Sequence, residues 1–165
     1  DFNGQELTTR WQHSSDKKGQ GLYGEGNHNL SVGDVNGDGL DEIIYGSSAL
    51  KPDGTLLYRT GFGHGDAMHL SDLDPDNDGL EVYGVHEEKN NQYSEEMRNQ
   101  NGIVLWGTTQ ENAGYVDNGR GLAADIDSTS RGFEMWSGTS GGIRTAKGTL
   151  LANTSPSVNF RIYGL

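Results

Sequence analysis

Short apolar stretches alternate along this chain with loops rich in aspartate, and one arrangement of the two occurs three times. In each copy an apolar stretch leads into an acidic loop, and a glutamate opens the next apolar stretch; the copies span residues 30–45, 68–83 and 121–136. Apolar runs of this length bounded by Asp, Asn and Gly are typical of β-strands joined by turns. The pattern predicts an all-β repeat protein with little helix.

Two further strands are predicted in each repeat, because each carries a dipeptide that suits a tight hairpin turn. These dipeptides are Asp53-Gly54, Asn101-Gly102 and Lys147-Gly148. Each repeat then forms a blade of four antiparallel strands. We expect blades at residues 30–66, 67–119 and 120–158, the end of a preceding blade and a linker at 1–29, and the start of the next blade at 159–165. Propellers contain about 4–8 blades, so these three predict an arc of a β-propeller whose remaining part completes the fold.

The acidic loops are the first candidates for chemistry. Oxygen-bearing side chains at alternate positions, followed by a glycine that permits a sharp turn, can surround a hard cation such as Ca²⁺. The candidate ligands are Asp34, Asn36, Asp38, Leu40 and Glu42 in the first loop, Asp72, Asp74, Asp76, Asp78 and Glu81 in the second, and Asp125, Asp127 and Glu134 in the third. We therefore expect several bound calcium ions.

A simpler interpretation of these loops is that they are turns without a metal. Asp, Asn and Gly tolerate left-handed backbone and hydrogen-bond within their own loop. In the first two loops the regular spacing of oxygen donors favours calcium. In the third loop Ser, Thr, Ser and Arg at residues 128–131 replace the middle carboxylates, so both interpretations stay open there.

Composition narrows the class of protein and its partners. The chain has no cysteine, 26 glycines, three prolines and a net charge of -12 at pH 7, which favours an extracellular β-protein without disulfides or thiolate metal ligands. Nucleic-acid binding requires clustered Lys and Arg, and these are absent. No apolar stretch approaches the ~20 residues of a membrane-spanning helix. We expect a secreted protein whose partners are neither nucleic acid nor membrane.

Four segments carry a resemblance to a known family. They are residues 26–39 (Gly-Asn-His-Asn-Leu-Ser-Val-Gly-Asp-Val-Asn-Gly-Asp-Gly), 63–69 (Gly-His-Gly-Asp-Ala-Met-His), 120–127 (Arg-Gly-Leu-Ala-Ala-Asp-Ile-Asp) and 159–162 (Asn-Phe-Arg-Ile). Over essentially its whole length the chain resembles the rhamnogalacturonan lyases of polysaccharide lyase family eleven. The resemblance implies an eight-bladed propeller that cleaves rhamnogalacturonan I, a pectic polysaccharide, by calcium-dependent β-elimination.

The same resemblance implies a separate calcium site in the catalytic cleft, with His28, His64, Asp66 and Glu87 as ligands. It also places Arg120 near the cleft, where a guanidinium could pair with a uronate carboxylate; the alternative is an arginine that supports an acidic loop. His64 and Arg120 are the candidate catalytic residues. Imidazole ligands by themselves favour zinc or another transition metal, whereas the resemblance favours calcium.

The alternative function is a non-catalytic, calcium-stabilised propeller module of the FG-GAP or integrin-like kind, used for carbohydrate binding or adhesion. Such a module would carry similar acidic loops, but it gives no reason for two histidines and two acids to converge. His13, His69 and His86 are interpreted as ordinary surface or strand histidines rather than as metal ligands. Trp11, Trp106 and Trp136 are interpreted as packing between blades rather than as platforms for sugars.

Overall fold

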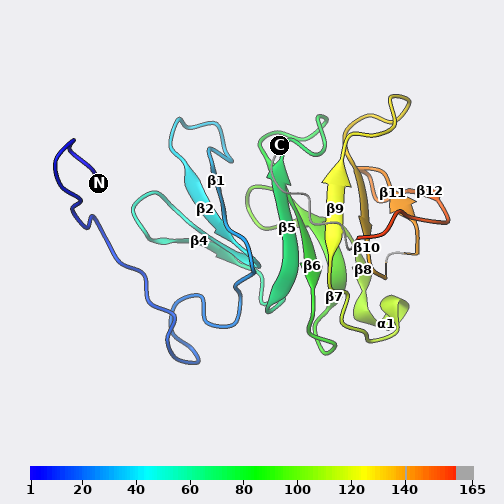
Figure 1. Ribbon diagram of the computed structural model, residues 1–165, viewed down its shortest axis with the longest axis horizontal. Helices are drawn as coiled ribbons and strands as arrows, with labels where there is room; N and C mark the ends of the chain where they lie inside the picture. The colour runs from blue at the N-terminus through cyan, green and yellow to red at the C-terminus, as the bar shows by residue number, and fades with distance from the viewer. Residues whose placement is uncertain (140, 159–165) are drawn as a thin grey trace.

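The computed structural model describes residues 1–139 and 141–158, and these form three four-stranded antiparallel sheets arranged side by side (Figure 1). The first sheet contains β1 (Ser31–Gly33), β2 (Glu42–Tyr45), β3 (Ser48–Leu50) and β4 (Leu56–Arg59). The second contains β5 (Gly65–Ser71), β6 (Glu81–His86), β7 (Tyr93–Arg98) and β8 (Val104–Thr109). The third contains β9 (Gly121–Ala124), β10 (Glu134–Ser137), β11 (Ile143–Arg144) and β12 (Leu150–Ala152).

In every sheet the strands are neighbours in the order in which they follow along the chain. The prediction of an all-β chain with four antiparallel strands in each repeat is therefore confirmed. Within the described residues the only helix is α1 (Gln110–Ala113), a single turn after β8. No helix of this part of the chain has the length and apolar character needed to cross a membrane.

The turns that join the third and fourth strands lie at the three predicted dipeptides. Their glycines have positive φ angles of 82° at Gly54, 78° at Gly102 and 75° at Gly148. Each glycine N–H donates to the carbonyl three residues earlier, at distances of 2.9, 2.9 and 2.8 Å. Residues with a Cβ rarely adopt such φ values, so these glycines fix where each hairpin turns.

Aromatic rings from the preceding repeat pack against the same glycines. A Cβ on the glycine would lie 2.6 to 2.7 Å from the ring in each case: Gly54 meets Trp11, Gly102 meets Tyr58 and Gly148 meets Trp106. The indole N–H of Trp11 also donates to Pro52 O, and that of Trp106 donates to Ala146 O, both at 2.9 Å. Trp106 thus joins the second and third repeats, as predicted, and Trp11 packs on the first repeat from the segment that precedes it.

The core consists of two apolar clusters, one on each side of the second sheet. The first contains Val35, Ile44, Ala49, Tyr58, Met68 and Val82. The second contains Leu73, Tyr83, Val85, Met97, Met135 and Ala146. Successive residues of a strand face opposite sides, so Val82 packs toward the first sheet and Tyr83 toward the third. All six residues of β6 are buried, and the second sheet contributes to both clusters.

Two predicted boundaries need comment. The first blade was expected to end at residue 66, but β5 begins at Gly65, because Gly65 pairs with both Asn27 and His86. The segment 1–29 contains isolated bridges, Phe2 to Leu7 and Asn27 to Gly65, and no extended strand. Its assignment to a preceding blade stays a prediction. The strand expected at 159–165 lies outside the described residues.

The sheets have two distinct ends. The loops that follow β1, β5 and β9 all lie at one end, at the top of Figure 1, and contain the aspartates. We call this the acidic end. The start of β5, the end of β6 and helix α1 lie at the opposite end.

Candidate metal centre

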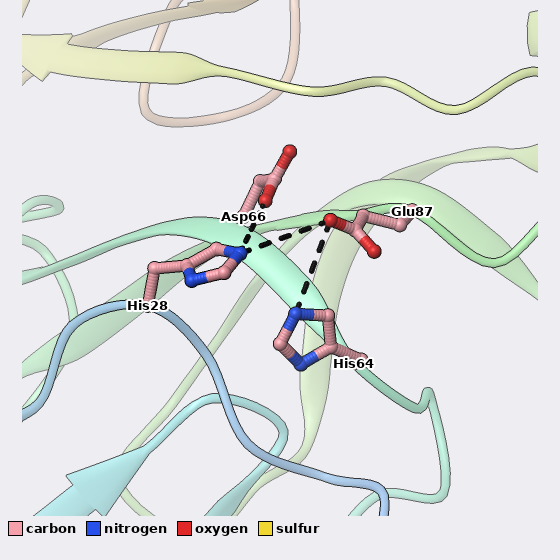
Figure 2. A group of neighbouring side chains, drawn as sticks. All are labelled: His28, His64, Asp66 and Glu87. Carbon is pink, nitrogen blue, oxygen red and sulfur yellow. Dashed lines mark ion pairs between the residues drawn. The ribbon is translucent and has the colours of Figure 1, made fainter.

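Two histidines and two acids meet at the end of the sheets opposite the acidic loops (Figure 2). One potential ligand atom from each of His28, His64, Asp66 and Glu87 lies within 4.8 Å of the other three. His28 Nε2 is 3.0 Å from Asp66 Oδ1 and 3.9 Å from Glu87 Oε1, and His64 Nε2 is also 3.9 Å from Glu87 Oε1. Among the described residues this is the one such convergence of three or more His, Cys, Asp or Glu side chains.

His28 is carried by a strap of extended chain that precedes β1. Ser47 N donates to Glu25 O at 2.8 Å, and Gly65 N donates to Gly26 O at 3.2 Å. Asn27 then forms a parallel bridge with Gly65. The strap is thereby fixed between the first and second sheets before it reaches His28.

The other three ligand candidates come from the second sheet. His64 and Asp66 flank Gly65, where the pairing of β5 with β6 shifts register, so Asp66 occupies a β-bulge. Bulges redirect side chains and are frequent next to functional sites. Glu87 follows β6 directly, and its N–H donates to His64 O at 3.3 Å. The bulge and this hydrogen bond bring the three side chains to one place.

The group concentrates negative charge in a half-buried position. The side chain of Asp66 is 13% exposed and that of Glu87 is 32% exposed. Sharing a hydrogen bond with Asp66 raises the pKa of Glu87, and burial raises it further, while His64 acts in the opposite direction. Two neighbouring carboxylates resist simultaneous ionisation unless a cation lies between them. The arrangement therefore suits a bound cation.

The spacing of the donor atoms bears on which cation would fit. Ligands of tetrahedral zinc at about 2.0–2.1 Å stand about 3.4 Å apart, whereas calcium ligands at about 2.3–2.6 Å can stand about 5 Å apart. The donor atoms of this group lie within 4.8 Å of one another. The donor chemistry, with two imidazoles, favours a transition metal, and this spacing also admits the larger ion.

Arg120 lies beside the group rather than at an acidic loop. Its Nη1 donates to the backbone carbonyl of Asp66 at 3.0 Å and is 3.8 Å from Asp66 Oδ1. The side chain is 53% exposed, so part of the guanidinium fork faces solvent. Of the two interpretations of this arginine, the contacts with Asp66 favour a position beside the candidate metal centre over support of an acidic loop.

At the acidic end, the first loop is organised by its own backbone. Asp34 accepts N–H groups from Gly37, Asp38 and Gly39 at 2.8 to 3.0 Å, and the Gly39 N–H lowers the pKa of Asp34 most. Glu42 is buried and accepts from Val35 N at 3.2 Å. The remaining contacts follow the same pattern: Asn36 Oδ1 accepts from Asp38 N, and Asp38 Oδ1 accepts from Leu40 N.

The second loop is paired with cationic side chains of the third repeat. Lys147 Nζ lies 2.7 Å from Asp74 Oδ2 and 3.3 Å from Asp76 Oδ2, and Arg131 Nε lies 2.7 Å from Asp76 Oδ1. The hydrogen bond from Arg131 lowers the pKa of Asp76 most. Glu81 is fully buried, and its burial raises its pKa. In the described structure the side chains of Asp72 and Asp78 make no such bonds.

The third loop is closed by hydrogen bonds from small polar groups. Asp127 Oδ1 accepts from the N–H of Thr129 at 2.9 Å and from its hydroxyl at 2.7 Å. Glu134 accepts from Ile126 N and Asp127 N. Asp125, the remaining candidate ligand, immediately follows β9. Within the described ranges, no acidic loop shows a convergence of three or more His, Cys, Asp or Glu side chains like the one at the opposite end.

Sequence reasoning missed a buried ion pair behind the candidate metal centre. Arg98 and Glu96 are both fully buried on β7, and Glu96 also contacts His86, the residue before Glu87. The only signal for them was a pair of opposite charges two positions apart in a strand, which places them on the same face. Polar residues in a strand normally indicate a solvent-exposed face, so this signal pointed the wrong way.

Comparison with known proteins identifies relatives over nearly the whole chain. Residues 1–164 match the family model described as rhamnogalacturonan lyase family 11, C-terminal domain. The chain is 47% identical to rhamnogalacturonan exolyase YesX of Bacillus subtilis (strain 168) over 99% of this chain and 28% of that protein. It is likewise 47% identical to rhamnogalacturonan endolyase YesW of the same organism, over 98% of this chain and 26% of that protein.

Solved structures of relatives share the fold. A structure of Bacillus licheniformis rhamnogalacturonan lyase PL11 matches with a TM-score of 0.86 and 49% identity, covering 96% of this chain and 27% of that one. The 1.40 Å structure of YesW matches with a TM-score of 0.83 and 46% identity, covering 94% and 26%. The chain spans about a quarter of the length of these relatives. With the family model matched over residues 1–164, the chain belongs to rhamnogalacturonan lyase family 11.

Proposed function

We propose that this chain forms part of a secreted, calcium-dependent rhamnogalacturonan lyase, and that its three sheets are blades in an eight-bladed propeller. The observation that carries the proposal is the convergence of two histidines and two acids at one end of the sheets. The similarity to a named exolyase and a named endolyase supports rhamnogalacturonan I as the substrate. An adhesion module has no need of this convergence.

The four converging side chains would hold one Ca²⁺ at the cleft. When bound there, the ion supplies positive charge beside the carboxylate of a galacturonate residue. Arg120 is placed to bind the same carboxylate, because part of its guanidinium faces solvent next to Asp66. Preorganised charge of this kind stabilises the negative charge that develops in a transition state. In this proposal Arg120 orients the uronate and His64 acts as a metal ligand.

The reaction that fits this arrangement is β-elimination. A base removes the proton on C5 of the galacturonate, whose acidity rises when the adjacent carboxylate is neutralised. The electron pair forms the C4–C5 double bond as the C4–O4 bond breaks, and the departing rhamnose oxygen takes up a proton. No water is consumed. We assign charge stabilisation and substrate orientation to this chain, and the base to another part of the enzyme.

The acidic loops have a structural role in the proposal. We propose that they bind further calcium ions, which offset repulsion between carboxylates and stiffen the end of each blade. In the first two loops the oxygen donors recur at alternate positions. In all three, a buried glutamate accepts backbone N–H groups from the start of the loop.

The test uses the complete enzyme that contains this chain. After treatment with a chelator, the enzyme is incubated with rhamnogalacturonan I, and the ultraviolet absorbance of the unsaturated uronate product is followed. Calcium should restore product formation and zinc should not. His64→Ala should prevent this rescue, whereas His13→Ala, in the segment before the first sheet, should not. Binding of the polymer without any new absorbance would refute the lyase and favour the adhesion module.

A further inference from the structure

A buried ion pair adjoins His86, the residue before the ligand candidate Glu87, and it has no part in the proposed mechanism. Arg98 and Glu96 are 0% exposed, and His86 is 2% exposed. Arg98 Nη1 donates to Glu96 Oε1, and His86 Nε2 lies 3.4 Å from the same oxygen. A buried ion pair is weak evidence for stability, because removing both charges from water costs about as much as their attraction returns. Its position needs another explanation.

Arg98 connects this pair to the strap that carries His28. Its Nη2 donates to the carbonyl of Gly46, in the turn between β2 and β3, and its Nε donates to Tyr58 Oη at 3.2 Å. Gly46 has a φ of 61°, and a Cβ there would lie 2.2 Å from Glu25 O. The Gly46 turn therefore rests directly on the strap that leads to His28, and Arg98 holds that turn from the second sheet.

His86 connects the pair to the other three ligand candidates. It ends β6 immediately before Glu87, and its backbone pairs with Gly65, between His64 and Asp66. Its ring also packs edge-on against Phe62, with ring centroids 5.8 Å apart. His86 thus lies where the chain leaves β6 and pairs with the first residue of β5.

The neighbouring strand leaves room for the network. Gly84 lies opposite Glu96 in the register of β6 and β7. A Cβ on Gly84 would lie 2.7 Å from Glu96 Oε1 and 3.1 Å from Arg98 Nη1. Glycine inside a strand often marks a close approach of other groups. At Gly84 the missing side chain leaves the space that the side chains of Glu96 and Arg98 occupy.

We propose that Arg98, Glu96 and His86 form a positioning network that holds the metal ligands at their binding distances. Arg98 fixes the strap of His28, His86 fixes the start of β5 and the position of Glu87, and Glu96 couples the two. The inference deepens the proposed calcium centre and rests on it. Outer-shell groups of this kind typically change metal affinity by about 10–100-fold when they are removed.

Calcium titration of the full-length protein by calorimetry tests the network. The binding that His64→Ala removes defines the cleft ion and separates it from ions at the acidic loops. The double variant Arg98→Met with Glu96→Gln leaves no unpaired charge in the interior but breaks the link to Gly46. It should weaken the cleft ion about tenfold or more.

Glu95→Gln provides the matched control. Glu95 is the neighbour of Glu96 on β7 and is equally buried, but its carboxylate accepts from Tyr83 Oη at 2.6 Å and from Thr108 Oγ1 at 2.8 Å. These partners lie on the face toward the third sheet. The variant should lower the melting temperature and leave the affinity of the cleft ion within twofold of the parent.

The outcomes separate the two proposals. If the double variant binds the cleft ion with an affinity within twofold of the parent, the positioning network is overturned and the calcium centre stays intact. The same conclusion follows if Glu95→Gln weakens binding of the cleft ion as much as the double variant does. If His64→Ala removes no calcium binding, the calcium centre and the network both fail. Should the double variant not fold, Tyr58→Phe removes only the hydroxyl that accepts from Arg98. It should weaken the cleft ion about threefold, and unchanged affinity would overturn the network.

Discussion

Both ends of the sheets contain carboxylates, the acidic end in its loops and the opposite end in the candidate metal centre, but these carboxylates have different partners. At the acidic end each repeat supplies its own loop, and many carboxylates are satisfied by backbone N–H groups or, in the second loop, by Lys147 and Arg131. At the opposite end the carboxylates of Asp66 and Glu87 face each other and two imidazoles. Repetition produces a local and self-sufficient structure, whereas convergence gathers donor atoms from distant parts of the chain around one point.

The comparison teaches that acidic composition alone does not locate a functional site. The loops share a sequence pattern and remain ordered through local hydrogen bonds. The ligand group has no local pattern, because it draws on a strap before β1, a bulge in β5 and the residue after β6. Function should therefore depend most on the converging group, and folding stability should depend most on the loops.

The largest expected effect is a contrast between alanine variants of two glutamates, Glu87 at the candidate metal centre and Glu81 at the acidic end. In the complete enzyme Glu87→Ala should lower the turnover rate about 100-fold or more, because one element of charge stabilisation is lost. Its melting temperature should change little, since Glu87 is partly exposed. Glu81→Ala should instead destabilise folding by about 1–3 kcal/mol, because it leaves the buried Asp74 N–H without its acceptor.

Turnover assays and thermal unfolding of both variants check this contrast. The rate per folded molecule should stay within about threefold of the parent in Glu81→Ala. A variant of Glu81 that folds normally but loses turnover would break the division between the two ends.

A smaller effect concerns pH and His69, which lies on β5 between the two ends. Burial lowers the pKa of His69 below its usual value, and the ring is 3.1 Å from Gly121 O. The unfolded chain then binds the proton more readily than the folded one. The contribution to stability is complete above the ordinary histidine pKa and is lost as pH falls through it, by at most about 1.4 kcal/mol per pH unit.

Denaturant unfolding of the parent and of His69→Gln between pH 7.5 and 5 isolates this contribution. The glutamine does not titrate, so its stability should fall less steeply with decreasing pH. Parallel curves would show that His69 has no part in the pH dependence. Because His69 no longer titrates in this variant, any remaining pH dependence of stability from the candidate metal centre is easier to measure.

The smallest effect tests whether Lys147 takes the place of a cation at the second loop. Lys147→Met should lower stability by less than about 1 kcal/mol, because the lysine is 53% exposed and its ion pairs are screened. It should also enlarge the rise in melting temperature on adding calcium, since Asp74 and Asp76 then lack a counter-charge. Lys89→Met, at a lysine without an ion pair in the described structure, should leave that rise unchanged. Equal calcium effects in both variants would contradict the idea.

Local signals in the sequence predicted the parts of the fold that depend on neighbouring residues. The turn glycines Gly54 and Gly102 require a left-handed backbone, and the glutamates that open the second strands bond back to their own loops. The start of β5 at Gly65 could not be predicted in this way, because it depends on pairing with residues far away in sequence.

The candidate site shows the same limit. The first sheet lies between His28 and Glu87 in the sequence, and no rule of residue spacing predicts that their side chains meet. The family resemblance implied the grouping, and the structure gives the distances. The Arg98–Glu96 pair was missed because β7 is buried on both faces. A strand in that position loses the alternation from which buried residues are normally inferred.

Two of the aromatic rings that cover the turn glycines are indoles, and each can serve as an optical reporter of the joint where it lies. Trp11 lies at the joint with the first sheet, Tyr58 at the joint between the first and second, and Trp106 at the joint between the second and third. Because the chain also contains Trp136, replacing Trp136 and one of these two indoles by phenylalanine leaves a single tryptophan whose fluorescence follows one joint. Separation at these two joints can thus be timed one at a time, without attaching any label.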